Sequence, residues 1–134
     1  MLERVETDYG IIDIERPAAA KIIKETILRH EDVYGITNAK GIRSSFSSRF
    51  AFDQDKNYIR ITKDKEDGIF IEVDLILRFG VSISGTTSQL IREIREDLKV
   101  QADIEPALIT LHIIGLKPSG RNPKIIERDI VVKG

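Results

Sequence analysis

Two histidines, His30 and His112, are the side chains of this sequence best suited to moving a proton near neutral pH. General acid–base catalysis needs such a group together with a partner that orients it. Neither histidine lies in a Ser-His-Asp or Cys-His arrangement, and His30 comes near the end of an expected helix, where the helix dipole favours a cation. We therefore predict structural or surface histidines and assign no catalytic residues.

A run of carboxylates and amides, Asp53-Gln54-Asp55-Lys56-Asn57, begins like a calcium-binding loop. Such a loop requires glycine at its sixth position and a bidentate glutamate at its twelfth. Tyr58 and Asp64 occupy these positions, so the sharp turn and the full ligand set are both missing. We expect a solvated turn and no metal site.

A glycine- and hydroxyl-rich stretch, residues 80–87, precedes the second expected helix. Phosphate can bind at such a helix start, but the stretch matches neither the P-loop nor the dinucleotide-binding fingerprint. Thr86 and Gln89 have the spacing of a capping box, which explains the hydroxyls as helix-start chemistry. We expect no bound cofactor.

Two basic segments are candidates for contacts with RNA. Residues 41–50 mix arginine, serine and phenylalanine, which can contact phosphates and stack on bases. The C-terminal tail carries further basic residues, at Lys117, Arg121, Lys124, Arg128 and Lys133. A nucleic-acid (RNA) binding module that uses these two segments therefore remains the alternative function.

The composition limits the class of protein. The chain has 134 residues, 21 Lys and Arg against 22 Asp and Glu, and a net charge of -1, which does not favour strong binding to polyanions. It has no cysteine, which excludes disulfides and thiolate chemistry. No apolar run approaches the ~20 residues of a membrane span, and the N-terminus does not look like a signal peptide. We expect a protein that stays inside the cell.

The elements that must position these residues follow from hydrophobic periodicity and turn signals. In chain order we expect a strand at 9–14, a helix at 17–30, strands at 58–63 and 69–79, a helix from 86, and a strand at 107–114. Pro17 suits the first turn of the first helix. Asp67-Gly68 suits the hairpin turn between the two middle strands, and residues 33–36 suit a turn.

The strand at 69–79 carries the clearest pattern. Every odd position is apolar, so we expect Ile69, Ile71, Val73, Leu75, Leu77 and Phe79 to face inward. The expected fold is a two-layer α+β sandwich, β-α-β-β-α-β, with a four-stranded, mainly antiparallel sheet and both helices on one face. Residues 1–116 would form this single domain. Residues 117–134 would be an extension whose strand-like tail pairs with a sheet edge of this chain or of another chain.

Four pieces of the sequence, in order, resemble the alkaline-shock-protein family of Gram-positive bacteria. A long amphipathic strand ends in aromatic-Gly before a helix, and an opening strand, a Val-x-Gly-apolar turn and a closing apolar-Gly-apolar strand accompany it. These pieces lie at 70–83, 9–14, 33–36 and 111–116.

The resemblance implies a non-enzymatic interaction or scaffold protein in the cell-envelope stress response or in lipid homeostasis. It further implies a cytoplasmic protein that self-assembles or associates with the membrane through a protein partner, without inserting into the membrane itself. That partner would be a membrane-embedded anchor or a lipid-synthesis protein. The family pattern supplies no catalytic, cofactor-binding or metal-binding residues.

Overall fold

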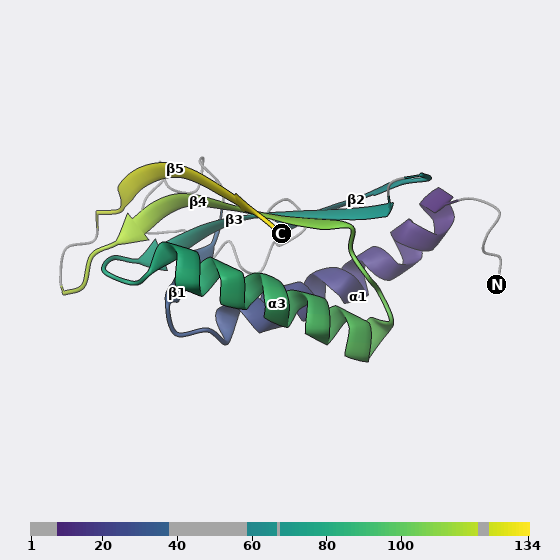
Figure 1. The fold of residues 1–134 in the computed structure, drawn as a ribbon, viewed down its shortest axis with the longest axis horizontal. Coiled ribbons are helices and arrows are strands. Elements are labelled where there is room, and N and C mark those ends of the chain that lie inside the picture. The colour runs from purple at the N-terminus through teal and green to yellow at the C-terminus, as the bar shows by residue number, and fades with distance from the viewer. Residues whose placement is uncertain (1–7, 38–58, 67, 121–123) are drawn as a thin grey trace.

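A five-stranded mixed sheet is covered on one face by two helices, as Figure 1 shows. The computed structural model describes residues 8–37, 59–66, 68–120 and 124–134. Its helices and strands are α1 Asp8–Leu28, β1 Val33–Ile36, β2 Ile59–Asp64, β3 Gly68–Arg78, α3 Ile83–Ala102, β4 Leu108–Lys117 and β5 Ile126–Lys133. The expected α+β sandwich with both helices on one sheet face is confirmed.

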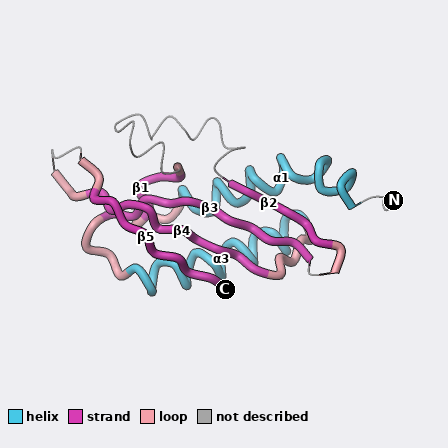
Figure 2. Tube along the Cα trace, turned by 90° about the horizontal axis from the view of Figure 1, so that it is seen from above, coloured by secondary structure: helices cyan, strands magenta, loops and turns pink. Residues whose placement is uncertain are grey.

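The sheet is built around β3. Its strand order is β1-β3-β4-β5, and β2 also pairs with β3. β3 and β4 are parallel and are connected through α3, whereas the other pairs are antiparallel. β1 and β2 follow each other along the same edge of β3, as Figure 2 shows.

The hydrophobic core lies between the sheet and the helices. α3 turns its predicted apolar face inward, and Leu90, Ile94 and Leu98 are fully buried. α1 contributes Ile23 and Ile27, also fully buried. The side chains that the sheet adds to this core include Ile71, Val73, Leu75, Leu77, Ile109, Leu111 and Ile113.

The alternation predicted for the middle strand holds over most of its length. Ile71, Val73, Leu75 and Leu77 are buried in the core beneath the helices. The inward placement expected for Phe79 is wrong, because its side chain is 57% exposed. β3 ends at Arg78, and Gly80 then turns the chain with a φ of +98°. Phe79 therefore belongs to a turn and no longer follows the alternation of the strand.

The strand expected at residues 9–14 is wrong, because α1 already begins at Asp8. A short apolar run cannot by itself distinguish a strand from a helix. Pro17 consequently lies inside the helix and not in its first turn. One edge of β3 carries β1 at Val33–Ile36, a segment whose sequence favours a turn. With β5, this gives five strands in place of four.

The start of the second helix also differs from expectation. α3 begins at Ile83, and the side chain of its N-cap residue Ser82 accepts a hydrogen bond of 3.1 Å from the Gly85 amide. Thr86 is buried, and its hydroxyl donates to the Asp32 carboxylate at 2.9 Å. The capping box expected at Thr86 and Gln89 is therefore wrong, because the helix starts one turn earlier.

The strand-like tail pairs within its own chain. β5 lies antiparallel to β4, and Ile126, Ile130 and Val132 pack against the core. The pairing extends to Gly134, whose amide and carbonyl exchange hydrogen bonds of 2.9 Å with those of Ile109. The intrachain form of the predicted tail pairing is confirmed.

Candidate functional site

The two histidines lie in different surroundings. His30 follows α1, and its Nδ1 accepts a hydrogen bond of 3.2 Å from the Asp32 amide. His112 is half-buried on β4, in register with Asp74 of β3 and Val131 of β5. His30 thus stabilises the turn between α1 and β1, and His112 belongs to the sheet face opposite the helices.

The structure places the other expected segments as follows. The stretch at 80–87 forms the β3–α3 turn and the first turn of α3, where its hydroxyls make caps and local hydrogen bonds. The carboxylate run at 53–57 and the Arg/Ser/Phe segment at 41–50 lie outside the described residues. Within the described part of the chain, no group of three or more His, Asp or Glu side chains could hold a metal ion.

The described basic residues of the tail, Lys117, Lys124, Arg128 and Lys133, do not form one patch. Lys133 is in register with Thr110 near the start of β4, whereas Lys117 ends the same strand. Since β5 runs antiparallel to β4, basic side chains from Lys124 to Lys133 are distributed along the length of the sheet edge. A site for single-stranded nucleic acid would also need aromatic side chains on which bases stack, and β5 has none.

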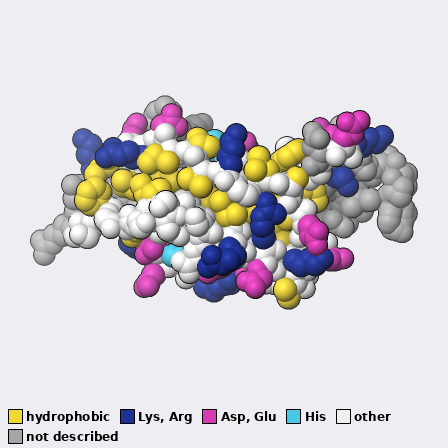
Figure 3. Space-filling view, in the orientation of Figure 1, with side chains coloured by type: hydrophobic (Ala, Val, Ile, Leu, Met, Phe, Trp, Pro, Cys, Tyr) yellow, Lys and Arg dark blue, Asp and Glu magenta, His cyan; other side chains and the backbone are white. Residues whose placement is uncertain are grey.

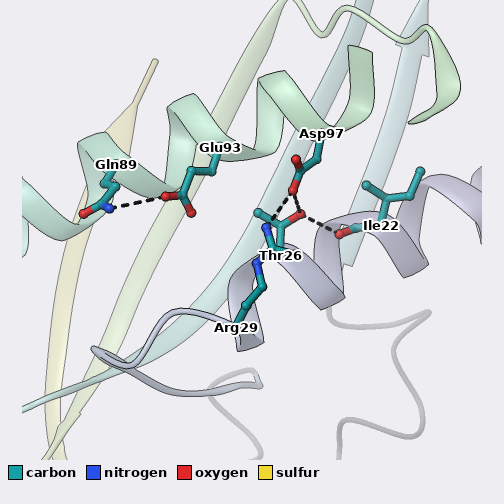
Figure 4. A network of polar contacts seen from close by, with 6 residues as sticks. All are labelled: Ile22, Thr26, Arg29, Gln89, Glu93 and Asp97. Atoms are coloured by element: carbon teal, nitrogen blue, oxygen red, sulfur yellow. Dashed lines mark hydrogen bonds and ion pairs between the residues drawn. The ribbon is translucent and has the colours of Figure 1, made fainter. Parts of the chain in front are cut away.

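A polar network joins the two helices on their outer side, as shown in Figure 4. The hydroxyl of Thr26 lies 2.6 Å from the Asp97 carboxylate and 2.8 Å from the Ile22 carbonyl. Nη2 of Arg29 donates to the same carboxylate oxygen at 2.9 Å. The hydrogen bond from Thr26, followed by that from Arg29, lowers the pKa of Asp97 below its ordinary value.

A second polar cluster lies on β2 and β3. Arg60 Nη2 donates to Asp74 at 3.0 Å, and its Nε donates to Glu72 at 3.2 Å. These hydrogen bonds, first of all the one to Asp74, raise the pKa of Arg60 against the opposing effect of desolvation. In each of the two networks the arginine is thus paired with a carboxylate of the same network.

A third cluster combines an aromatic ring with two cations and was not singled out from the sequence. Cζ of Arg78 lies 5.6 Å from the ring centroid of Tyr34, and Nζ of Lys117 lies 5.5 Å from it. The three residues come from β1, β3 and β4, and Arg78 and Lys117 are directly opposite each other in the parallel register. Sequence spacing carries no signal for such a cluster, because it depends on strand pairing.

None of the helices in the described part of the chain is both long and apolar enough to span a membrane. The three clusters combine charged side chains with a hydroxyl, with one another or with an aromatic ring.

Comparisons of the sequence with known proteins identify a family. Residues 4–118 match the model of the alkaline shock protein 23 family, which is described as having a cell envelope-related function. The chain is also 20% identical over 124 residues to "Uncharacterized protein Spy1614" of Streptococcus pyogenes serotype M6, a match that covers 91% of this chain and 100% of that protein. No solved structure matches the chain.

Proposed function

The chain belongs to the alkaline shock protein 23 family, and from that premise we propose that it is a non-enzymatic interaction protein of cell-envelope or lipid homeostasis. The family match over residues 4–118 carries this proposal. Both histidines serve the fold and the sheet surface, which also supports a role in contact rather than in turnover. The protein would act in the cytoplasm and reach the membrane through a protein partner, either a membrane-embedded anchor or a lipid-synthesis protein.

The test is capture of the partner from the native cell. The full chain, carrying an affinity tag and cross-linked before lysis, would be recovered with and without nuclease treatment. Recovery of a membrane or lipid-synthesis protein that survives nuclease supports the proposal. Recovery of RNA alone contradicts it in favour of the nucleic-acid alternative, which further predicts binding that weakens steeply as salt rises.

Self-association is the second part of the proposal. β5 ends the sheet path, and its eight residues contain no proline that would prevent a further strand from pairing. Val131 is 47% exposed on this strand. An antiparallel pair of two β5 strands centred on Ile130 would also place Glu127 of each copy opposite Lys133 of the other. We therefore expect two copies to continue one sheet across their β5 edges.

Light scattering of the purified full chain tests the self-association. A dimer mass that falls to the monomer mass in Val131→Glu supports pairing through β5, because in this register the new carboxylate would face Asp129 of the other copy and like charges repel. Ser88→Glu, at an exposed position of α3, introduces the same charge away from β5 and should leave the mass unchanged. A monomer mass for the unmodified chain contradicts this part of the proposal.

A further inference from the structure

Arg78 and Lys117 form a cation pair that is unfavourable by itself. They lie directly opposite each other on β3 and β4, where like charges repel. Tyr34 offsets part of that repulsion, because the negative face of its ring attracts both cations. The fold thus holds two positive charges close together at one end of the sheet.

The cation pair has no counter-charge within the described residues. Nε of Arg78 donates to the Glu31 carbonyl at 3.0 Å, and Nζ of Lys117 donates to the Pro118 carbonyl at 2.9 Å. Both partners are neutral backbone groups, and neither cation forms an ion pair with a described carboxylate. The terminal nitrogens of Arg78 and the remaining hydrogens of Lys117 are suited to binding an incoming carboxylate.

Apolar surface borders the cation pair. Phe79 follows Arg78 directly, is 57% exposed, and donates its amide to the Lys117 carbonyl at 2.9 Å. A hollow of about 460 Å³ lies next to the cation pair, lined by residues 124–127 and by Pro118, which follows Lys117 directly. Figure 1 shows the β3–α3 turn and the chain leaving β4 at the same end of the molecule. The hollow contains one residue of each charge, Lys124 and Glu127, and its other lining residues are apolar, so it favours an apolar side chain.

We propose that the cation pair, Phe79 and this hollow bind a short acidic segment of a partner protein. A carboxylate of the segment contacts Arg78 and Lys117, and a neighbouring apolar side chain contacts Phe79 or enters the hollow. This inference rests on the proposed function as an interaction protein and adds the chemistry of the partner.

The charge distribution favours an acidic segment over a membrane or a nucleic acid. The net charge is -1, and Figure 3 shows positive and negative side chains interspersed over the face it displays. Membranes and nucleic acids are attracted by several basic residues acting together. Membrane binding also needs a large apolar face, whereas the described residues of the β3–α3 turn expose a single large aromatic side chain. A short acidic segment needs only local contacts.

The first test uses the full chain and a fluorescent peptide that alternates glutamate and leucine. Replacing both cations, by Arg78→Gln with Lys117→Gln, should weaken binding at least about tenfold, since hydrogen bonds to charged groups are the stronger ones. Lys117→Arg, which keeps the charge, should retain binding. A matched control, Arg92→Gln with Lys21→Gln, removes two exposed charges elsewhere and should leave binding unchanged.

Four outcomes overturn the site: no binding of the acidic peptide, equal binding of a peptide with glutamine in place of glutamate, equal binding by the doubly substituted chain, or binding only to vesicles containing phosphatidylglycerol. Capture of the partner from the native cell distinguishes failure of the proposed binding site from failure of the proposed function. If the doubly substituted chain still recovers the partner of the unmodified chain, the function stands and the site is wrong. If the unmodified chain recovers no protein, the proposed function itself fails.

Discussion

The Thr26 hydroxyl on α1 lies 2.6 Å from the Asp97 carboxylate on α3, although the two residues are 71 positions apart in the sequence. Thr26 is only 1% exposed. Because a hydroxyl has one proton to donate, the contacts with Asp97 and with the Ile22 carbonyl share that proton. This hydrogen bond connects the two helices outside their hydrophobic contact, and its energetic contribution can be measured.

Thr26→Val should lower the free energy of unfolding by about 1–2 kcal/mol. Valine has nearly the shape of threonine but lacks the hydroxyl that donates a hydrogen bond to Asp97. Urea unfolding followed by circular dichroism measures the change. Thr62→Val provides the control, since Thr62 is exposed on β2 and the same substitution there should change stability by less than about 0.5 kcal/mol. Equal effects at both positions would contradict a specific role for the hydroxyl.

The pH dependence of stability should reveal Asp97. Its folded-state pKa lies below the value of about 3.9 expected in the unfolded chain, because Thr26 and Arg29 hydrogen-bond to the ionised form. Asp97 therefore stabilises the fold above about pH 4, and this contribution is lost as the pH falls through the lower, folded-state pKa. In Asp97→Asn the loss of stability on acidification should be smaller. A parallel pH profile in both proteins would show that Asp97 contributes nothing to it.

Leu77 and Phe79, two positions apart on the same chain segment, should respond very differently to truncation. Leu77 is fully buried, so Leu77→Ala should cost about 2–5 kcal/mol through the loss of apolar contacts and the cavity left behind. Phe79 is more than half exposed, so Phe79→Ala should stay within about 0.5 kcal/mol. Denaturant midpoints compare the two. A large loss at Phe79 would show that it packs inward after all, as the alternation predicts.

Ser82 should be the residue that caps α3. Ser82→Ala removes the oxygen that accepts from the Gly85 amide and should cost about 1 kcal/mol. Ser88→Ala, at an exposed position inside the same helix, should be neutral or slightly stabilising because alanine is the better helix former. Thermal unfolding of both variants tests the assignment, which an opposite order would refute.

Arg95 should stabilise the pairing between the end of β5 and the start of β4. Its guanidinium donates to the Pro106 carbonyl at 2.7 Å and to the Gly134 carbonyl at 2.8 Å. Arg95→Gln should therefore speed hydrogen exchange of the Ile109 and Gly134 amides by about tenfold, since these two residues close the β4–β5 pairing. Arg92→Gln, on the exposed side of the same helix, should leave those exchange rates unchanged.

Helices and strands whose hydrophobic pattern repeats over many residues could be predicted from the sequence. The alternation from Ile71 to Leu77 and the apolar face of α3 from Leu90 to Leu98 repeat over several turns or residue pairs, and both are buried as expected. The run at 9–14 is too short to separate a strand from a helix, so its assignment was wrong. A run of apolar residues this short fits a strand and a helix equally well.

Features that depend on pairing between distant segments could not be predicted. β1 at Val33–Ile36 has four residues, and the pairing register shifts between Val33 and Gly35, which no local pattern announces. The contact of Thr26 with Asp97 and that of Tyr34 with Arg78 and Lys117 arise only once the helices and strands are in place. The polar clusters therefore required the structure, whereas the buried face of the sheet did not.

The two strands on one edge of β3 behave as a single strand interrupted once. Ile36 pairs with Leu75 and Ile59 pairs with Val73, so the end of β1 and the start of β2 lie only two positions apart along β3. Joining such close endpoints requires few residues, and the entropy of closing a loop changes slowly with its length. The connection between β1 and β2 is consequently a suitable insertion site for protein engineering. Linkers of different length or a reporter domain could be exchanged there while the sheet keeps its register.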